Sequence, residues 1–344
     1  MIILSVESSC DETAAAVTLD GRTVLSSEVF SQSDLHALYG GVVPEIASRE
    51  HIKIVDKLAD TALRTAGISK PEIDAIAVTY APGLIGALLV GVSFAKSAAF
   101  GLGVPLIPVH HMRGHIAANY IAFPELEPPF MCLVVSGGHS MIVGVDDYTS
   151  FRIIGMTRDD AAGECFDKAA RVLGLGYPGG PAIDRLAQSY HGESVDFKLP
   201  IGRVDGREFD CSFSGLKTAV VNIVHNTEQK DEALDKAALA AAINRAVSAA
   251  LVPRVMEASK RFGYNKIAVA GGVAANSRIR ADLETACSET GIALYCPPLS
   301  LCADNAAMIG CQGYYEFLAG TRGDNNLNGV ASLSIEQSYP HSEI

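Results

Sequence analysis

The first thirty residues, MIILSVESSCDETAAAVTLDGRTVLSSEVF from Met1 to Phe30, decide which fold class this chain adopts. Met1 to Val6 is an apolar run, and Thr13 to Leu19 and Arg22 to Phe30 are two further runs of strand-forming residues. The dipeptide Asp20-Gly21 separates the last two runs and favours a hairpin turn. The segment therefore predicts a meander of three strands with an acidic, hydroxyl-rich first turn.

Helices and strands alternate after this meander. Pro44 begins a helical pattern that continues through Ala66 and ends at Gly67. The next elements are expected to be a strand at 73–79, a helix at 84–101 and a strand at 104–109. This last strand leads into a histidine-rich helix at its C-terminal end, which is the edge where ligand sites gather in open α/β sheets.

The same order starts again after residue 129. Strands are expected at 130–135, 140–145, 151–156 and 266–270, with a short one near 293. Helices are expected at 163–173, 181–190, 216–224, about 231–262, 275–287 and about 304–318. We therefore predict an α/β protein of two similar lobes, residues 1–125 and 126–322, with an insertion in the second lobe and a loose polar tail at 323–344.

The segment VHHMRGHIAAN, Val109 to Asn119, contains a candidate metal-binding pair. In a helix, His111 and His115 lie on one face, so both imidazoles can bind one metal ion. No Glu follows His111 directly, so the general base of the H-E-x-x-H zinc proteases is missing. A polar helix face with incidental histidines stays open as the structural alternative.

Asp304, in the sequence LCADN before the last predicted helix, is the candidate third ligand. Two imidazoles and one carboxylate with open positions suit iron(II) or zinc. Asp is also a preferred N-cap residue of helices, and the sequence leaves this simpler role equally open.

Three glycine-rich turns are candidates for nucleotide binding. Ser136-Gly137-Gly138 joins two strands and lets backbone amides approach an anion closely. Gly271-Gly272 lies before a helix whose first turn carries Asn276, and Gly179-Gly180-Pro181 precedes a helix whose first turn carries Asp184. Each alone is more often a tight turn, but three at corresponding strand ends favour a nucleotide.

Composition and missing motifs exclude other classes. The net charge of −12 argues against a general nucleic-acid binder, although the Lys and Arg residues between Arg245 and Arg280 provide a local basic stretch. The longest apolar run, 84–95, is too short to span a bilayer, and the eight cysteines form no C-x-x-C pair, so we expect a cytoplasmic protein with reduced thiols. Gly174-x-Gly176-x-x-Gly179 follows a helix rather than a strand, and no Gly-Lys pair occurs, which excludes a Rossmann dehydrogenase and a P-loop ATPase.

Six motifs along the chain carry a specific resemblance. They are VESSCDET from Val6, HMRGH from His111, VSGGH from Val135, GECFDKAA from Gly163, SFSGLKT from Ser212 and GGVAAN from Gly271. Over about residues 1–320 the chain resembles the universal tRNA threonylcarbamoyladenosine transferase family, in its bacterial TsaD-type catalytic form. The resemblance implies the actin, Hsp70 and sugar-kinase (ASKHA) superfold of two ribonuclease-H-like lobes, with a helical insertion in the second.

The resemblance also implies roles for individual residues. It implies that His111, His115 and Asp304 bind a metal ion, usually iron, with zinc as the alternative. Asp11 and Glu12 match the acidic turn beside the reacting centre. The positions that match the family's adenylate-binding residues are Val134, Val135, Ser136, Gly137, Gly138, Asp167, Gly180, Asp184 and Asn276.

The implied reaction transfers a threonylcarbamoyl group from threonylcarbamoyl-AMP to the exocyclic amine of the adenosine 3′ to the anticodon, in tRNAs that read codons beginning with A. An aromatic amine is a weak nucleophile, so a general base helps, and Asp11 is the first candidate and Glu12 the second. The implied partners are a paralogous subunit and a small P-loop ATPase, with no membrane. A small-molecule kinase of the same superfold and a non-catalytic paralogous scaffold stay as alternatives, and neither needs the metal ligands.

Overall fold

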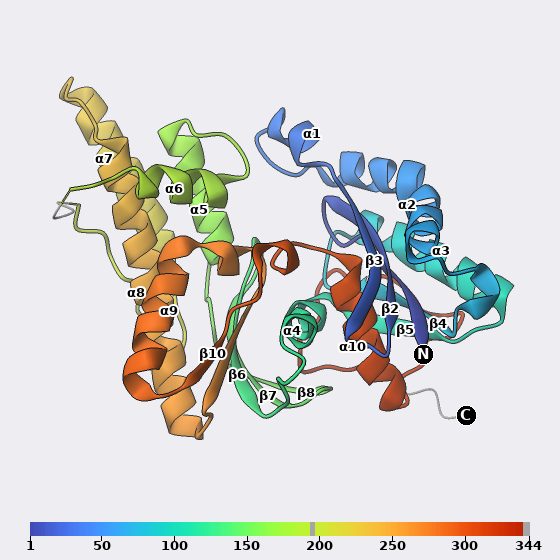
Figure 1. The fold of residues 1–344 in the computed structure, drawn as a ribbon. Coiled ribbons are helices and arrows are strands. Elements are labelled where there is room, and N and C mark those ends of the chain that lie inside the picture. The colour runs from blue at the N-terminus through green and yellow to red at the C-terminus, as the bar shows by residue number, and fades with distance from the viewer. Residues whose placement is uncertain (193–196, 340–344) are drawn as a thin grey trace. The chain divides into compact units, whose positions relative to one another are not determined.

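The computed structural model describes residues 1–192 and 197–339, which form two compact units (Figure 1). Unit 1 comprises Met1–Pro128, Val145–Arg152 and the chain from Pro297 onward, and unit 2 comprises Pro129–Gly144 and Ile153–Cys296. The first division lies near the expected boundary at 125/126. The second differs from the expected boundary at 322/323, because the last helix packs on the sheet of unit 1.

Unit 1 is built on a five-stranded sheet with the order β3-β2-β1-β4-β5. Its strands are β1 Ile2–Glu7, β2 Glu12–Leu19, β3 Thr23–Ser31, β4 Ala75–Ala81 and β5 Leu106–His110. The pairs β1–β2 and β2–β3 are antiparallel, as the predicted meander requires, whereas β4 pairs in parallel with β1 and β5. The parallel strands β1, β4 and β5 therefore end at one edge of the sheet, and this edge carries Glu7 and His110.

Helices cover both faces of this sheet (Figure 1). The helices of unit 1 are α1 Ser33–Ala37, α2 Pro44–Ala66, η1 Lys70–Glu72, α3 Ile85–Leu102, α4 His111–Ala122, η3 Leu299–Leu301 and α10 Ala306–Leu318. Alternate residues of β1 point to opposite faces. Leu4 and Val6 pack with α2 and α3, whereas Ile3 packs with Met308 of α10 and Ala118 of α4.

Unit 2 repeats this plan. Its sheet consists of β6 Phe130–Val135, β7 Ser140–Asp147, β8 Ser150–Met156, β9 Lys266–Ala270 and β10 Ala293–Tyr295, in the order β10-β9-β6-β7-β8. The hairpin Val145–Arg152, which joins β7 and β8, is grouped with unit 1. Its helices are α5 Ala162–Leu173, α6 Gly179–Gln188, α7 Ser214–Gln229, α8 Lys236–Phe262, η2 Gly272–Ala275 and α9 Ser277–Thr290. Read from β8, this strand order matches that of unit 1, so the duplicated α/β pattern is confirmed. Helix α8 precedes β9 as α2 precedes β4, and the helices α5 to α7 are the insertion in the second copy.

The segment after Arg322 packs along unit 1 as far as it is described, so the expectation of a loose tail is wrong for residues 323–339. The backbone N–H of Val330 donates to Tyr80 O at 2.8 Å. Leu327 and Ile335 anchor the segment, each only 2% exposed. These few apolar anchors and backbone hydrogen bonds hold a segment whose polar composition suggested exposure.

Two helices, α3 and α8, are long and apolar enough to cross a membrane by length and composition alone, since α3 extends the apolar run 84–95 to Leu102. In α3, 33% of the apolar segment is buried, and in α8, 67%. Both helices pack within their own unit, α3 against α2 and β4, and α8 against α6 and α9. Core helices of soluble proteins pass the same test, so this is weak evidence for membrane insertion.

Candidate metal centre and glycine-rich site

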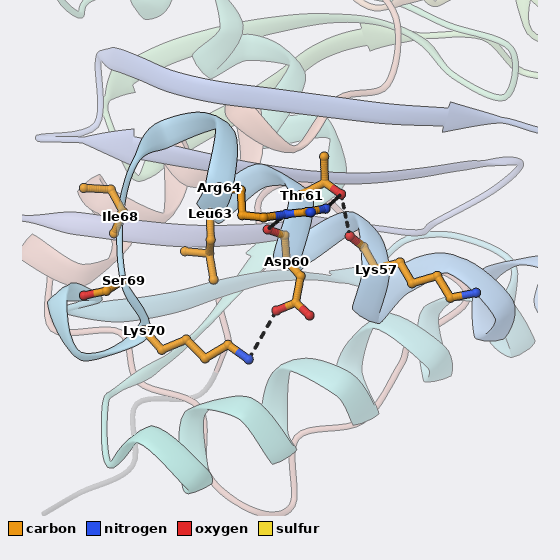
Figure 2. A pocket seen from close by; sticks show the side chains of 8 residues that line it. All are labelled: Lys57, Asp60, Thr61, Leu63, Arg64, Ile68, Ser69 and Lys70. Atoms are coloured by element: carbon orange, nitrogen blue, oxygen red, sulfur yellow. Dashed lines mark hydrogen bonds and ion pairs between the residues drawn. The ribbon is translucent and has the colours of Figure 1, made fainter.

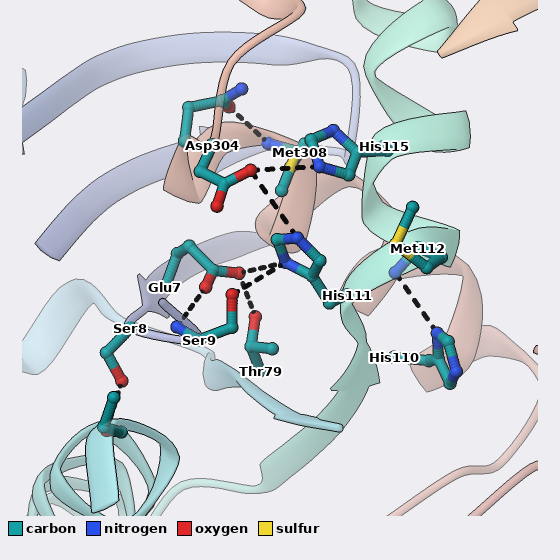
Figure 3. A network of polar contacts seen from close by, with 12 residues as sticks. Glu7, Ser8, Ser9, Thr79, His110, His111, Met112, His115, Asp304 and Met308 are labelled. Atoms are coloured by element: carbon teal, nitrogen blue, oxygen red, sulfur yellow. Dashed lines mark hydrogen bonds and ion pairs between the residues drawn. The ribbon is translucent and has the colours of Figure 1, made fainter. Parts of the chain in front are cut away.

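The histidine pair and Asp304 meet at one point in unit 1 (Figure 3). The rings of His111 and His115 lie on the same face of α4, with centroids 4.7 Å apart. Asp304 Oδ1 is 3.0 Å from Nε2 of His115 and 3.5 Å from Nε2 of His111. One ligand atom from each residue lies within 4.8 Å of the others. The structure thus brings together the three ligand candidates that the sequence indicates.

The N-cap alternative for Asp304 is wrong. Helix α10 begins at Ala306, and its N-cap is Asn305, whose side chain accepts a hydrogen bond from Met308 N at 2.9 Å. Asp304 therefore lies just before the cap, and its carboxylate faces the histidines of α4 instead.

The third histidine of this segment, His110, has a structural role. It is the N-cap residue of α4, and its Nδ1 accepts from Met112 N at 3.2 Å. Its Nε2 lies 3.2 Å from Leu333 O in the C-terminal segment. The structural alternative, in which a histidine of this segment has no role in metal binding, therefore applies to His110. His111 and His115 instead converge on one carboxylate oxygen.

The environment of His115 fits a metal ligand. Its side chain is 1% exposed, and among the described residues neither ring nitrogen makes a hydrogen bond of good geometry. Nε2 lies 3.0 Å from Asp304, a contact that lowers the pKa of that carboxyl, whereas Nδ1 has no hydrogen-bond partner among the described residues. Leaving such a buried group unsatisfied costs about 1–3 kcal/mol. A divalent cation bound by two imidazoles and a carboxylate would satisfy all three groups.

The charges of the site reinforce one another. Burial alone would raise the pKa of Asp304, but the neighbouring His111 and His115 hold it well below its usual range. Burial alone would lower the pKa of His111, but the carboxylates of Glu7 and Asp304 raise it to about 9. The site therefore places ionised carboxylates around a cationic centre, which is the electrostatic environment of a metal cation.

Glu7 completes this network, and the sequence reasoning gave it no role in the site. The side chain is fully buried at the end of β1, and its Oε2 lies 2.9 Å from Nδ1 of His111. Burial alone would raise the pKa of Glu7, but His111 and the hydrogen bonds around it lower that pKa. A charged residue ending an otherwise apolar strand, IILSVE, was the signal that could have found it.

The other residues of the HMRGH motif connect the metal helix to its surroundings. A Cβ on Gly114 would lie 2.7 Å from a side-chain carbon of Ile309, so glycine allows α10 to approach α4 closely. The buried guanidinium of Arg113 pairs with Glu316 at 2.8 Å and donates to Ile335 O of the C-terminal segment. The motif thus combines two candidate ligands with two residues that fix the position of their helix.

The acidic turn between β1 and β2 belongs to the same unit. Asp11 is buried, and Glu12 accepts a hydrogen bond from Ser31 at 3.1 Å. Burial, together with the negative charges of Asp304 and Asp11, raises the pKa of Glu12 to about 9. The carboxyl group of Glu12 is therefore neutral at pH 7 when no cation screens Asp304.

In unit 2 several glycines of the predicted turns have open space beside them. A Cβ on Gly137, Gly138 or Gly180 would meet no atom within 4 Å. The turn at Ser136 is closed by two hydrogen bonds with His139, and the first amides of α5 donate to Ser136 O and Gly137 O. Val134 and Val135 are completely buried in β6.

The polar side chains expected to bind adenylate already have partners within unit 2. Asp184 accepts hydrogen bonds from Ser277 Oγ and Asn244 Nδ2, both at 2.8 Å. It lies in the middle of α6 rather than in its first turn, because this helix begins at Gly179. Asn276 is the N-cap of α9, and Asp167 accepts from the backbone N–H of Gly179 at 2.7 Å.

An open groove of about 590 Å³ lies elsewhere in unit 1 (Figure 2). It is lined by Lys57, Asp60, Thr61, Leu63, Arg64, Ile68, Ser69 and Lys70. The ammonium group of Lys70 lies 3.2 Å from Asp60, and both side chains are more than half exposed. Solvated lysines and one exposed ion pair do not make a specific site, so we assign this groove no role.

The fold and the site define the class: an ASKHA-type α/β protein of two lobes with a His-His-Asp cluster in the first. Solved structures support the fold. Full-length HypF in its phosphate- and nucleotide-bound form is 14% identical, with a TM-score of 0.61 over 96% of this chain and 47% of that one. Component A of the (R)-2-hydroxyglutaryl-CoA dehydratase of Acidaminococcus fermentans is 15% identical, with a TM-score of 0.53 over 92% of this chain and 98% of that one.

Sequence relatives identify the family. The profile of TsaD, tRNA N6-adenosine threonylcarbamoyltransferase, matches residues 23–311. A tRNA N6-adenosine threonylcarbamoyltransferase of Clostridium perfringens is 51% identical over 97% of this chain and 98% of its own length. One of Caldicellulosiruptor saccharolyticus is 48% identical over the same shares. The chain belongs to the tRNA N6-adenosine threonylcarbamoyltransferase family, and it is a transferase of tRNA modification.

Proposed function

We propose that the chain transfers the threonylcarbamoyl group of threonylcarbamoyl-AMP to the exocyclic amine of the adenosine 3′ to the anticodon, in tRNAs that read codons beginning with A. Membership of the family supports tRNA adenosine as the acceptor and threonylcarbamoyl as the transferred group. The observation that carries the assignment of the reaction to unit 1 is the convergence of His111, His115 and Asp304 within 4.8 Å.

The reaction exchanges one bond to the carbamoyl carbon. A bond forms between that carbon and the adenosine amine, and the bond from the carbon to the phosphate oxygen of AMP breaks. The amine loses a proton, and AMP leaves as a stabilised anion, so no Ser or Cys nucleophile is required. The weak step is attack by an aromatic amine, which is improved by orientation and by a general base.

The metal ion that we propose for His111, His115 and Asp304 is iron(II), with zinc as the alternative. When bound, it would hold the threonyl carboxylate and the carbamoyl oxygen and stabilise the charge that develops on that oxygen. His111, His115 and Asp304 would hold the ion through one ligand atom each, and substrate oxygens would complete its ligand set.

Asp11 is the general base that we propose. Both carboxylates of the acidic turn are candidates, and we place Asp11 first and Glu12 second. A general base typically contributes about 10²–10⁴-fold to the rate. An Asp11→Ala protein that keeps full transfer activity and its metal would contradict this role.

The adenylate part of the donor is proposed to bind in unit 2. The open positions at Gly137, Gly138 and Gly180 support contact between their backbone and a phosphate or ribose. Ser136 would contribute backbone groups of the same turn, and Val134 and Val135 at the end of β6 would position it. Asp167, Asp184 and Asn276 would bind through lone pairs left over from their hydrogen bonds within the fold.

We also propose cytoplasmic partners, namely a paralogous ASKHA-fold subunit and a small P-loop ATPase. Exposed apolar side chains on unit 1 support a protein partner. Ile52 of α2 is 65% exposed, and Ile85 and Leu89 of α3 are 48% and 39% exposed. The acidic net charge of −12 also favours a partner that helps to hold tRNA.

The experiment uses anaerobically purified protein with its metal content measured. The protein is mixed with threonylcarbamoyl-AMP, the partner subunits and a tRNA that reads A-starting codons, and the nucleosides are analysed by mass spectrometry. We expect modified adenosine that disappears in His111→Ala. The control His110→Asn keeps an N-cap acceptor on α4 and should stay active. Absence of modification in the wild type would overturn the proposal.

A further inference from the structure

The carboxylate of Glu7 is the most completely enclosed charged group near the candidate metal centre, with 0% exposure. A buried carboxylate is costly unless every oxygen is hydrogen-bonded. Here Oε1 accepts from the backbone N–H of Ser9 at 2.5 Å, and Oε2 accepts from Thr79 Oγ1 at 2.5 Å (Figure 3). The strand ends of β1 and β4 thus hold this carboxylate in one orientation.

The remaining contact of Glu7 is with a candidate metal ligand. Its Oε2 lies 2.9 Å from Nδ1 of His111, and the hydroxyl of Ser9 lies 3.2 Å from the same nitrogen. The opposite nitrogen of that ring, Nε2, faces Asp304 at 3.5 Å. Glu7 and Asp304 therefore contact opposite nitrogens of one imidazole (Figure 3).

We propose that Glu7 is a positioning residue, which accepts the Nδ1 proton of His111 as a hydrogen bond and so reserves Nε2 for the metal ion. This inference rests on the metal centre of the proposed function. A carboxylate hydrogen-bonded to the far nitrogen of a metal-bound imidazole fixes its tautomer and ring orientation and makes the ligand more basic. Thr79 and Ser9 act one step further out by fixing the carboxylate itself.

Glu7 is not a fourth metal ligand in this arrangement. The cluster of convergent ligand atoms consists of His111, His115 and Asp304 among the described residues. Glu7 lies on the Nδ1 side of His111, so the ring stands between its carboxylate and Asp304. His115 differs from His111, because no carboxylate is hydrogen-bonded to its Nδ1 among the described residues. We therefore expect both histidines to bind the same ion, but only His111 to be held in place by a carboxylate at its Nδ1.

The first test leaves Glu7 unchanged and uses a variant only to assign signals. Two-dimensional NMR of ¹⁵N-histidine in the zinc-loaded full-length chain distinguishes metal-bound from protonated ring nitrogens. We expect the His111 signals, assigned by their loss in His111→Asn, to show a protonated Nδ1 and a zinc-bound Nε2. Zinc bound to Nδ1 of His111, or a deprotonated Nδ1, would overturn the role of Glu7.

The second test compares two buried carboxylates that both pair with helix α4. Glu7→Gln removes the charge behind His111, whereas Glu316→Gln removes the charge paired with Arg113, which is not a ligand candidate. Zinc affinity is measured by competition with a chelator. We expect Glu7→Gln to weaken zinc binding about 10–100-fold, as is typical for such partners, and Glu316→Gln to leave it within about threefold.

The outcomes separate this inference from the metal assignment. Equal zinc affinity in Glu7→Gln and the wild type would overturn the positioning role alone. If His111→Ala binds zinc as tightly as the wild type, both proposals are overturned. If both Gln variants lower the melting temperature equally and weaken zinc binding equally, Glu7 is only structural. If Glu7→Gln does not fold, the NMR experiment on the wild type still decides.

Discussion

Units 1 and 2 share a strand order, but they differ in what their polar side chains have left to bind. In unit 1, His115 is buried without a well-formed hydrogen bond to either nitrogen among the described residues, and Asp304 faces it directly. In unit 2, Asp184 already accepts hydrogen bonds from Ser277, Asn244 and Gln188. The polar side chains of the first site therefore still have atoms that can bind a ligand. Those of the second site mostly form hydrogen bonds within the fold.

This difference teaches how each site would recognise a ligand. A buried group without a partner is costly, so a cluster of such groups persists most readily where a ligand satisfies them. Unit 1 therefore offers side chains to a cation. Unit 2 offers mainly backbone amides in open turns, such as Gly137 and Gly180, to an anion or a ribose.

The largest effect is expected from Asp304→Ala. The variant removes the oxygen on which both histidines converge, so we expect metal affinity to fall more than about a hundredfold, beyond the typical loss for an outer partner. Transfer activity should be lost with it. Elemental analysis after dialysis, together with nucleoside mass spectrometry, measures both. If Asp304→Ala still retains one metal ion per chain, the contrast between the units fails. Asp304 would then contribute no more to metal binding than Asp184 does.

The matched substitution in unit 2 is Asp184→Ala. It leaves Asn244 and Ser277 without their acceptor between α6, α8 and α9, so we expect unfolding to become easier by about 2–4 kcal/mol. Metal affinity should not change. Urea unfolding and zinc competition test the two halves of this expectation. Normal stability with a large rise in the KM for threonylcarbamoyl-AMP would show instead that Asp184 is mainly a ligand-binding residue.

Substitutions at two glycines of unit 2 are expected to have different effects, one on stability and the other on binding of the donor. Gly271 has φ +92°, and a Cβ there would collide with Val135 O, so Gly271→Ala should cost about 1–3 kcal/mol of stability. Gly137 has open space around it, so Gly137→Ala should keep stability within about 0.5 kcal/mol. We expect its KM for the donor to rise several-fold if this turn contacts the adenylate. An unchanged KM would remove the turn from the binding site.

The sequence predicted those features that depend on local pattern. The meander at the start, its repetition after residue 129 and the common face of His111 and His115 all follow from spacing along one segment. The role of Glu7 was not predictable in this way, since its partners Thr79 and His111 are 72 and 104 residues away. The same holds for Arg113, whose partner Ile335 is 222 residues away.

Other differences have the same origin. The tail was expected to be loose because its composition is polar, but a few buried anchors such as Leu327 decide its placement. Asp184 and Asn276 were assigned to a nucleotide because they stand near glycine turns. Their side-chain hydrogen bonds, which only the packed helices reveal, show a structural use as well.

A further expected effect concerns pH and the acidic turn of unit 1. Glu12 has a pKa of about 9 in the folded protein, against an ordinary value of 4.5, because of burial and the charges of Asp304 and Asp11. Folding therefore takes up a proton between these two pH values, so the contribution of Glu12 to stability is complete below about 4.5 and is lost as pH rises towards 9. Glu12→Gln mimics the protonated form and escapes this loss.

We expect the metal-free Glu12→Gln protein to melt at a higher temperature than the wild type at pH 8.5 and at nearly the same temperature at pH 4.5. Loading the wild type with zinc should narrow the difference at pH 8.5, because the cation offsets the charge of Asp304 that raises the pKa of Glu12. Calorimetry at the two pH values measures this, with Glu336→Gln, a carboxylate in the C-terminal segment, as the control. If the difference in melting temperature between Glu12→Gln and the wild type does not change with pH, the charge of Asp304 does not affect the carboxyl of Glu12. The electrostatic coupling in unit 1 would then be limited to the two histidines and their direct partners.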